Sequence, residues 1–296
     1  MFAGRFQNVA LGLVAFAILL TVAACNGGSS GGGTSFTGIK QTYVVAAGNR
    51  QLALTGRSGT YTTTTSVGSQ VLPVSLDETQ ITVGALSFPY LAKGKLLIGG
   101  GYSAFAANSV VSDPSTVPGS YVTMTGANFA GQLTIDKASN YVWCMRSAIS
   151  GSACADGSTP NTGTTSVQPT LGFQFSGVLG TYAIYQRGTS AAIFPISAQS
   201  LRLMALTQTS KPPSGSFAQP LSDATGNPPL VKTVFRGNSF SVTGYAPWDG
   251  EYPYTLSNGT ISFTSSQCPN NTCNAIYNNN LGMLFIARLG NALLIR

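Results

Sequence analysis

The chain has 296 residues, of which only 8% are charged, against about a quarter in an ordinary soluble domain. The formal net charge is +7, but Lys and Arg are scattered singly, whereas a nucleic-acid surface requires clustered basic residues, so we expect no nucleic-acid partner. The sequence contains no His, which excludes His-based triads, His metal sites and imidazole acid–base chemistry.

The first 24 residues have the pattern of an export signal. Arg5 lies in a short polar start, and residues 9–22 form a nearly uninterrupted apolar run. This run is shorter than the roughly 20 apolar residues of a membrane helix, and small residues follow it, as at a cleavage point.

Cys25 ends the motif Val22-Ala23-Ala24-Cys25, which resembles the lipobox of bacterial lipoprotein precursors. The resemblance covers residues 1–25 only. It implies that the thiol of Cys25 receives a diacylglycerol, that residues 1–24 are removed, and that a fatty acid such as palmitate acylates the new amino terminus. Two or three acyl chains hold a protein stably on a bilayer. The alternative is an ordinary secretory signal with an accidental Cys.

Residues 25–35 would carry the lipidated Cys and a Gly/Ser tether, which reads NGGSSGGGTS from Asn26. A Gly-rich coil of about ten residues has a root-mean-square reach of roughly 17 Å. Such a tether would hold the folded part clear of the lipid headgroups. In lipoproteins of this type an Asp after the Cys favours inner-membrane retention, so Asn26 indicates the outer membrane, with the domain in the periplasm or at the cell surface.

Residues 36–296 are expected to form one all-β domain. Short β-prone runs are separated by Gly, Pro, Asn and Ser, and no 3.6-residue periodicity occurs. We predict strands at Thr42–Ala46, Tyr61–Thr65, Gln80–Val83, Lys95–Ile98, Tyr121–Thr125, Gln132–Ile135, Tyr141–Met145, Phe173–Phe175, Tyr182–Gln186, Leu201–Leu206, Val231–Phe235 and Phe240–Thr243.

Turns and connectors are also visible. The clearest hairpin spans 254–263, where alternating apolar residues flank Asn258-Gly259, a pair that favours a type I′ turn. Segments 112–119 and 211–229 are rich in Pro, Gly and Ser and should be connectors. Segment 147–168 reads as a long Ser/Thr/Gly loop.

Three divergent repeat units are suggested near 57–100, 117–196 and 235–296. The pattern Leu179-Gly180-x-x-x-Ile184-x-x-x-Gly188-x-x-x-x-Ile193 recurs as Leu281-Gly282-x-x-x-Ile286-x-x-x-Gly290-x-x-x-x-Ile295, with a looser relative at Phe88–Ile98. Gly-x-aromatic openings precede them at Gly59, Gly119 and Gly237. Since one unit could not bury its apolar face alone, we expect one antiparallel barrel or sandwich of about three meander repeats, closed by residues 292–295.

Four Cys remain once Cys25 is used for lipid. An even number in an exported chain indicates disulfides, and four Cys allow three pairings. We predict the local pairing, Cys144–Cys154 and Cys268–Cys273. The rival interpretation is a four-Cys zinc site.

The candidate ligand-binding residues are clustered in one turn-rich segment and comprise Tyr245, Trp248, Asp249, Glu251 and Tyr252. Aromatic rings beside carboxylates are typical of sugar-binding surfaces, because the rings cover apolar sugar faces and the carboxylates accept hydroxyl hydrogen bonds. Two alternatives stay open. The segment could be an ordinary loop that caps the end of the sheet, or the two carboxylates could hydrolyse a glycan.

The expected function is non-enzymatic, in a lipoprotein of the cell envelope that binds a glycan, a protein or an envelope polymer. We expect no cofactor and no metal, and the bilayer is a partner through acylated Cys25. The alternatives are a structural envelope component without a small-molecule ligand, a carboxylate-dependent hydrolase, and a transmembrane barrel, which low charge and alternating segments would also suit.

Overall fold

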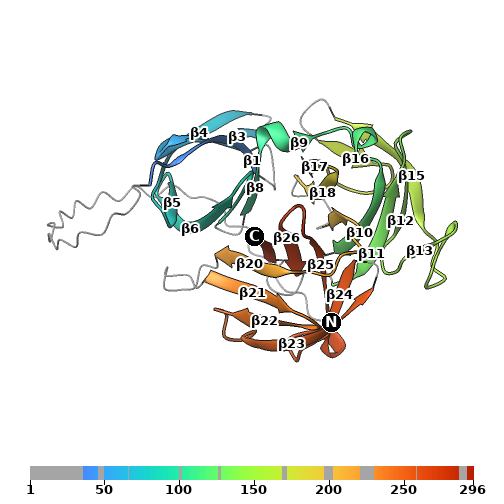
Figure 1. The fold of residues 1–296 in the computed structure, drawn as a ribbon. Coiled ribbons are helices and arrows are strands. Elements are labelled where there is room, and N and C mark those ends of the chain that lie inside the picture. Colours follow the sequence, from blue (N-terminus) through green and yellow to red (C-terminus); the bar gives the residue numbers. More distant parts are fainter. Residues whose placement is uncertain are drawn as a thin grey trace, which may run out of the picture. The chain divides into compact units, whose positions relative to one another are not determined.

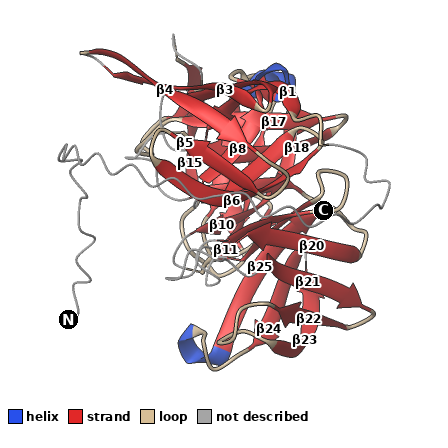
Figure 2. Cartoon of the chain, turned by 90° about the vertical axis from the view of Figure 1, so that its left-hand side faces the viewer, coloured by secondary structure: helices blue, strands red, loops and turns tan. Residues whose placement is uncertain are grey.

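Three antiparallel sheets follow one another along the chain, coloured blue to cyan, green to yellow, and orange to red in Figure 1. The computed structural model describes residues 36–45, 50–65, 67–99, 102–125, 128–168, 172–196, 203–220, 230–257, 259–286 and 292–296. Figure 2 shows that strands dominate this part, with only short 3₁₀ turns as helical elements. These turns are η1 (Ala107–Ser109), η2 (Pro114–Thr116) and η3 (Pro269–Asn271).

The first sheet is a closed barrel in which each strand pairs with the next and β8 returns to β1. Its strands are β1 (Ile39–Val45), β2 (Arg50–Gly56), β3 (Ser58–Thr65), β4 (Gly68–Leu76), β5 (Gln80–Val83), β6 (Leu86–Lys93), β7 (Leu96–Gly99) and β8 (Tyr102–Ala106).

The second sheet has nine strands. They are β9 (Val110–Val111), β10 (Gly119–Thr125), β11 (Ala130–Ile135), β12 (Asn140–Cys144), β15 (Asn161–Val167), β16 (Phe173–Phe175), β17 (Tyr182–Arg187), β18 (Ser190–Pro195) and β19 (Leu203–Thr207). β10 pairs with β19, and Phe173 pairs with Tyr182, so all strands except β9 form a ring. β9 pairs with β17. A separate hairpin joins β13 (Ile149–Ser150) to β14 (Ala153–Cys154).

The third sheet is again a closed barrel, in which β27 pairs with both β26 and β20. Its strands are β20 (Gly215–Pro220), β21 (Leu230–Arg236), β22 (Ser239–Thr243), β23 (Gly250–Ser257), β24 (Thr260–Thr264), β25 (Thr272–Asn278), β26 (Met283–Ile286) and β27 (Ala292–Ile295).

The predicted all-β class and its three-repeat arrangement are confirmed. Every predicted strand overlaps an observed one, and Ser257 pairs with Thr260 across the predicted hairpin. One expectation was wrong, because the repeats do not share a single barrel or sandwich. Each forms its own barrel-like sheet, since eight strands suffice to enclose an interior that side chains can fill. The predicted units lie inside these longer sheets.

Two predicted loops contain strands. Segment 147–168 holds β13, β14 and β15, and segment 211–229 holds β20. β15 was missed because its sequence, NTGTTSV, has no apolar alternation and its side chains are largely exposed. Residues 1–35, Asn258 and Gly290 lie outside the described residues.

Each sheet encloses its own apolar core. In the first barrel this core includes Tyr43, Leu54 and Ile81, in the second sheet Leu133 and Trp143, and in the third barrel residues such as Phe217 and Phe263. Strands that face solvent alternate between buried and more accessible positions, as β11 and β21 do. This is the period-two pattern of a sheet with one covered face.

A fourth core joins the three sheets. It takes residues from the outward faces of β7 and β8, β10 and β17–β19, and β25–β27. Phe105 of the first barrel stacks on Phe194 of the second sheet, with 3.9 Å between ring centroids. Strands at this place are buried on both faces and read as continuous apolar runs such as Leu96-Leu97-Ile98 and Met283-Leu284-Phe285-Ile286.

The two sequence copies at 179–193 and 281–295 coincide with strands that are buried on both faces. The copy at 179–193 forms β17 and β18, the sixth and seventh strands of the second ring, whereas the copy at 281–295 forms β26 and β27, the last two of the third. The two copies therefore occupy different places in the strand order. What they share is the burial of their described strand residues on both faces.

Three buried tyrosines predict an alkaline limit to stability. Tyr90, Tyr121 and Tyr277 lie one in each sheet, each donates its hydroxyl to a backbone carbonyl, and burial raises the pKa of each to about 12. In the unfolded chain a tyrosine ionises near pH 10, so the free energy of unfolding should be steady below that pH and fall between about pH 10 and 12. Urea titrations at pH 8, 10 and 11 measure this, and an unchanged midpoint at pH 11 would contradict it.

Removal of residues 291–296 should unfold the third barrel, because β27 joins β26 to β20 and buries Leu294 and Ile295. Limited proteolysis is the measurement, with a variant that lacks only Arg296 as the control. A shortened chain that stays soluble and protease-resistant would show that β27 is dispensable.

Candidate functional site

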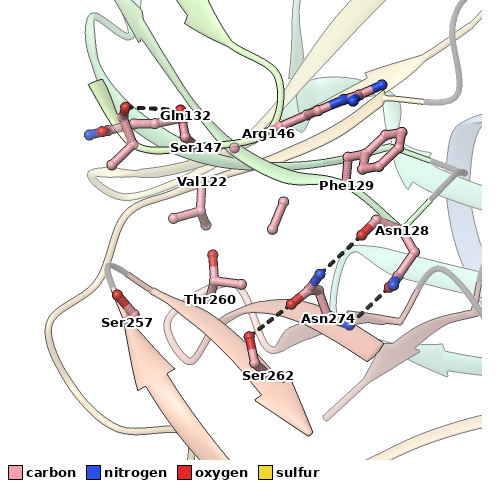
Figure 3. A pocket seen from close by; sticks show the side chains of 13 residues that line it. Val122, Asn128, Phe129, Gln132, Arg146, Ser147, Ser257, Thr260, Ser262 and Asn274 are labelled. Carbon is pink, nitrogen blue, oxygen red and sulfur yellow. Dashed lines mark hydrogen bonds between the residues drawn. The ribbon is translucent and has the colours of Figure 1, made fainter. Parts of the chain in front are cut away.

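A polar pocket of about 290 Å³ lies between the second sheet and the third barrel (Figure 3). The second sheet contributes residues from β10, from the turn into β11, from β11 itself and from the segment after β12. The third barrel contributes residues from β23, β24 and β25. The lining residues are Val122, Asn128, Phe129, Ala130, Gly131, Gln132, Arg146, Ser147, Ala148, Ser257, Thr260, Ser262 and Asn274.

One wall depends on a close approach of two backbones. A Cβ on Gly131 would collide with the carbonyl oxygen of Cys144 and with the backbone of Met145. Gly131 therefore lets β11 approach the chain that leaves β12. Next to it, the Oε1 atom of Gln132 accepts a hydrogen bond from the backbone N–H of Ile149 at 2.7 Å, which fixes the following hairpin to β11.

The Cys144–Cys154 disulfide fastens the same wall. It ties the end of β12 to β14 across a sequence separation of 10, and the enclosed segment includes Arg146, Ser147 and Ala148 of the pocket. The hydroxyl of Ser147 also donates to Asp156 at 3.0 Å. The disulfide and the Gln132 hydrogen bond thus hold the wall at both of its ends.

Arg146 stacks on the ring of Phe129, with 4.1 Å from the guanidinium carbon to the ring centroid. Both side chains are exposed. Within the part of the chain that the structure describes, Arg146 forms no ion pair within 4.0 Å. The ring holds one face of the guanidinium and leaves its N–H donors free for an acceptor.

An amide network connects the two sheets at the other side of the pocket. Asn128 is 8% exposed and adopts a positive φ of 68°. Its Oδ1 atom accepts from the backbone N–H of Asn274 at 2.8 Å, and the Nδ2 atom of Asn274 donates to the carbonyl of Asn128 at 3.0 Å. The hydroxyl of Ser262 donates to Oδ1 of Asn274 at 2.8 Å. These groups are already paired and serve to position the pocket.

Two hydroxyl groups in the pocket remain available. Ser257 ends β23 and Thr260 begins β24, and neither hydroxyl makes a hydrogen bond to the described part of the chain. Figure 3 shows them at the lower left of the pocket, opposite Arg146, whose guanidinium extends to the upper right over Phe129 and away from them. The pocket therefore offers a cation on one wall and hydroxyl groups on the opposite wall.

The structure places the predicted ligand residues at one end of the third barrel. Trp248 is only 5% exposed and belongs to the barrel core, where it contacts Phe263. Tyr252 stacks on Phe240 and donates its hydroxyl to the carbonyl of Trp248 at 2.9 Å. Their rings pack inward, so replacing Trp248 by Ala would cost about 3–5 kcal/mol of stability and would not be a clean test of binding.

The other three candidates lie at the surface. Tyr245 is 36% exposed, and its backbone N–H donates to Oδ1 of Asp249 at 2.8 Å. Glu251 accepts a hydrogen bond from the hydroxyl of Ser239 at 2.6 Å. The two carboxylates are thus engaged in local hydrogen bonds, and a ligand role for Tyr245, Asp249 and Glu251 stays a prediction.

The predicted disulfides are confirmed. Cys144 pairs with Cys154 and Cys268 pairs with Cys273, which removes the rival four-Cys zinc site. In the described ranges no group of three or more Cys, Asp and Glu residues is placed to hold a metal ion. Cys25 lies outside them.

Sequence reasoning missed the residues of the pocket. Arg146, Gln132 and Phe129 stand singly in the sequence and far from Asn274, so no local motif joins them. The available signal was the cysteines, because Arg146 lies two residues after Cys144 and Asn274 directly follows Cys273.

No family model, no curated protein and no solved structure matches this chain. Among the described residues, no helix has the length and apolar character needed to cross a membrane.

Replacing both Cys144 and Cys154 by Ser should free the Arg146 wall. The bridge closes a short loop, so its loss is expected to cost about 3 kcal/mol of unfolding free energy. Hydrogen exchange should rise in residues 145–160, while the amides of the first barrel keep their protection as an internal control. Unchanged exchange in 145–160 would mean that Gln132 and Gly131 alone hold the wall.

Proposed function

We propose that this chain is an exported lipoprotein of the bacterial envelope, anchored through acylated Cys25, and that its folded part is a non-enzymatic binding module. The observation that carries the proposal is the order of the segments. A lipobox-like motif at Val22–Cys25 is followed at once by a Gly/Ser tether and then by a β-rich unit. The outer membrane is the proposed location.

The binding half of the proposal is supported by the pocket between the second sheet and the third barrel. Its walls are fixed by a disulfide, by a side chain to backbone hydrogen bond and by an amide network. The side chains of Arg146, Ser257 and Thr260 have no hydrogen-bond partner among the described residues, so they can contact a ligand. A rigid pocket with unpaired polar groups suits recognition, because little ordering is needed on binding. A glycan or another envelope polymer is the proposed class of partner.

A Cys25→Ala variant tests the anchor. The wild-type protein should carry acyl chains in its intact mass and enter the detergent phase on Triton X-114 partition, whereas the variant should lack both properties. Cys268→Ser is the matched control and should keep the anchor, because Cys268 pairs with Cys273. An unlipidated wild-type mass would contradict the proposal.

Retention on isolated envelope polysaccharide tests the binding half. Intact protein should be retained, and the variant with both Cys144 and Cys154 replaced by Ser should be retained at least several-fold less, because its pocket wall is released. Equal retention of both proteins would show that the polysaccharide binds elsewhere than in this pocket. If neither protein is retained, a structural role is favoured.

A further inference from the structure

The geometry of the pocket points to a carboxylated monosaccharide unit, such as a uronic acid, as its ligand. This inference rests on the proposed binding function and names the ligand class of the same pocket. In this arrangement the carboxylate of the sugar pairs with Arg146, and the ring hydroxyls of the sugar bind Ser257 and Thr260 across the pocket.

The charge of the pocket favours one carboxylate. Among the described residues that line it, Arg146 is the single charged one. A guanidinium presents a planar fork of donors that matches a carboxylate in a bidentate pair. A phosphate monoester carries about −1.5 to −2 charges at neutral pH, which one guanidinium does not balance. Since Arg146 has no second basic residue beside it in the described lining, a carboxylate with one negative charge suits it better than a phosphate monoester does.

Asp156, an acidic residue that bonds to the neighbour of Arg146, does not neutralise the charge of the Arg146 guanidinium. Asp156 bonds to Ser147 next to Arg146, but it is absent from the pocket lining. Its Oδ1 atom also accepts hydrogen bonds from the N–H and the hydroxyl of Ser158, and these bonds, chiefly those from Ser158, lower the pKa of its carboxyl group. The carboxylate is thus satisfied by its own turn.

The rest of the pocket suits a small polyol. Ser257 and Thr260 supply hydroxyl groups that both donate and accept, as sugar hydroxyls do. Val122, Ala130 and Ala148 supply a few apolar contacts between the two walls. A volume of about 290 Å³ lies at the lower end of the range of small-molecule pockets, so one sugar unit fits and a lipid chain does not.

Calorimetric titration of the intact lipoprotein in detergent micelles tests the inference. Glucuronate is the probe, glucose is its neutral match, and inorganic phosphate tests a general anion site. Glucuronate should bind at least ten times more tightly than either of the others. Arg146→Gln should weaken glucuronate binding at least tenfold, whereas Arg236→Gln, a change at an exposed Arg outside the pocket, should leave it unchanged.

A second variant tests the opposite wall. Replacing Ser257 by Ala and Thr260 by Val should weaken glucuronate binding several-fold while circular dichroism stays the same. Phosphate binding as tight as that of glucuronate, or equal glucuronate binding by wild type and Arg146→Gln, would overturn the inference. If the polysaccharide retains the protein but glucuronate does not bind, the ligand class is wrong and the proposed function stands. If neither binds, both fail.

Discussion

The apolar core shared by the three sheets is the interaction on which the rest of the structure depends. Each sheet fills its own interior, but several strands also carry apolar side chains outward, and Phe105, Phe194 and Phe285 meet there. Left uncovered, such outward patches would favour association with other proteins. Because the core couples the sheets, it also sets the second sheet beside the third barrel, where the pocket forms.

The strands themselves could be predicted, because their local signals are strong. Alternation in Gln132–Ile135 and the Asn258-Gly259 pair depend only on neighbouring residues. The closure into three separate sheets depends on pairings such as Tyr43 with Ala106, between residues far apart in the sequence. Two-sided burial gave apolar runs in β17 and β26. These two strands carry matching parts of the two sequence copies, although they hold different places in the strand order.

The pocket could not be predicted for a similar reason. Gln132 and Asn274 line the same pocket only because two sheets pack together, and each is an ordinary polar residue in its own strand. The segment with the most suggestive composition, around Trp248, uses Trp248 and Tyr252 to fill one end of a barrel. A buried tryptophan and an exposed one are identical in sequence, and the core of β22 and β24 decides between them.

The scarcity of carboxylates links the composition to the pocket. With eight acidic residues against fifteen basic ones, some cations must lack an acidic neighbour, and Arg146 stacks on Phe129 instead. Stacking restrains the guanidinium without neutralising it, and the Cys144–Cys154 bridge restrains its backbone. A cation held in place before the ligand arrives loses less conformational freedom on binding. The scarcity of acidic residues therefore leaves Arg146 without an acidic partner, so that it can bind an anion. The Cys144–Cys154 disulfide restrains the backbone that carries it.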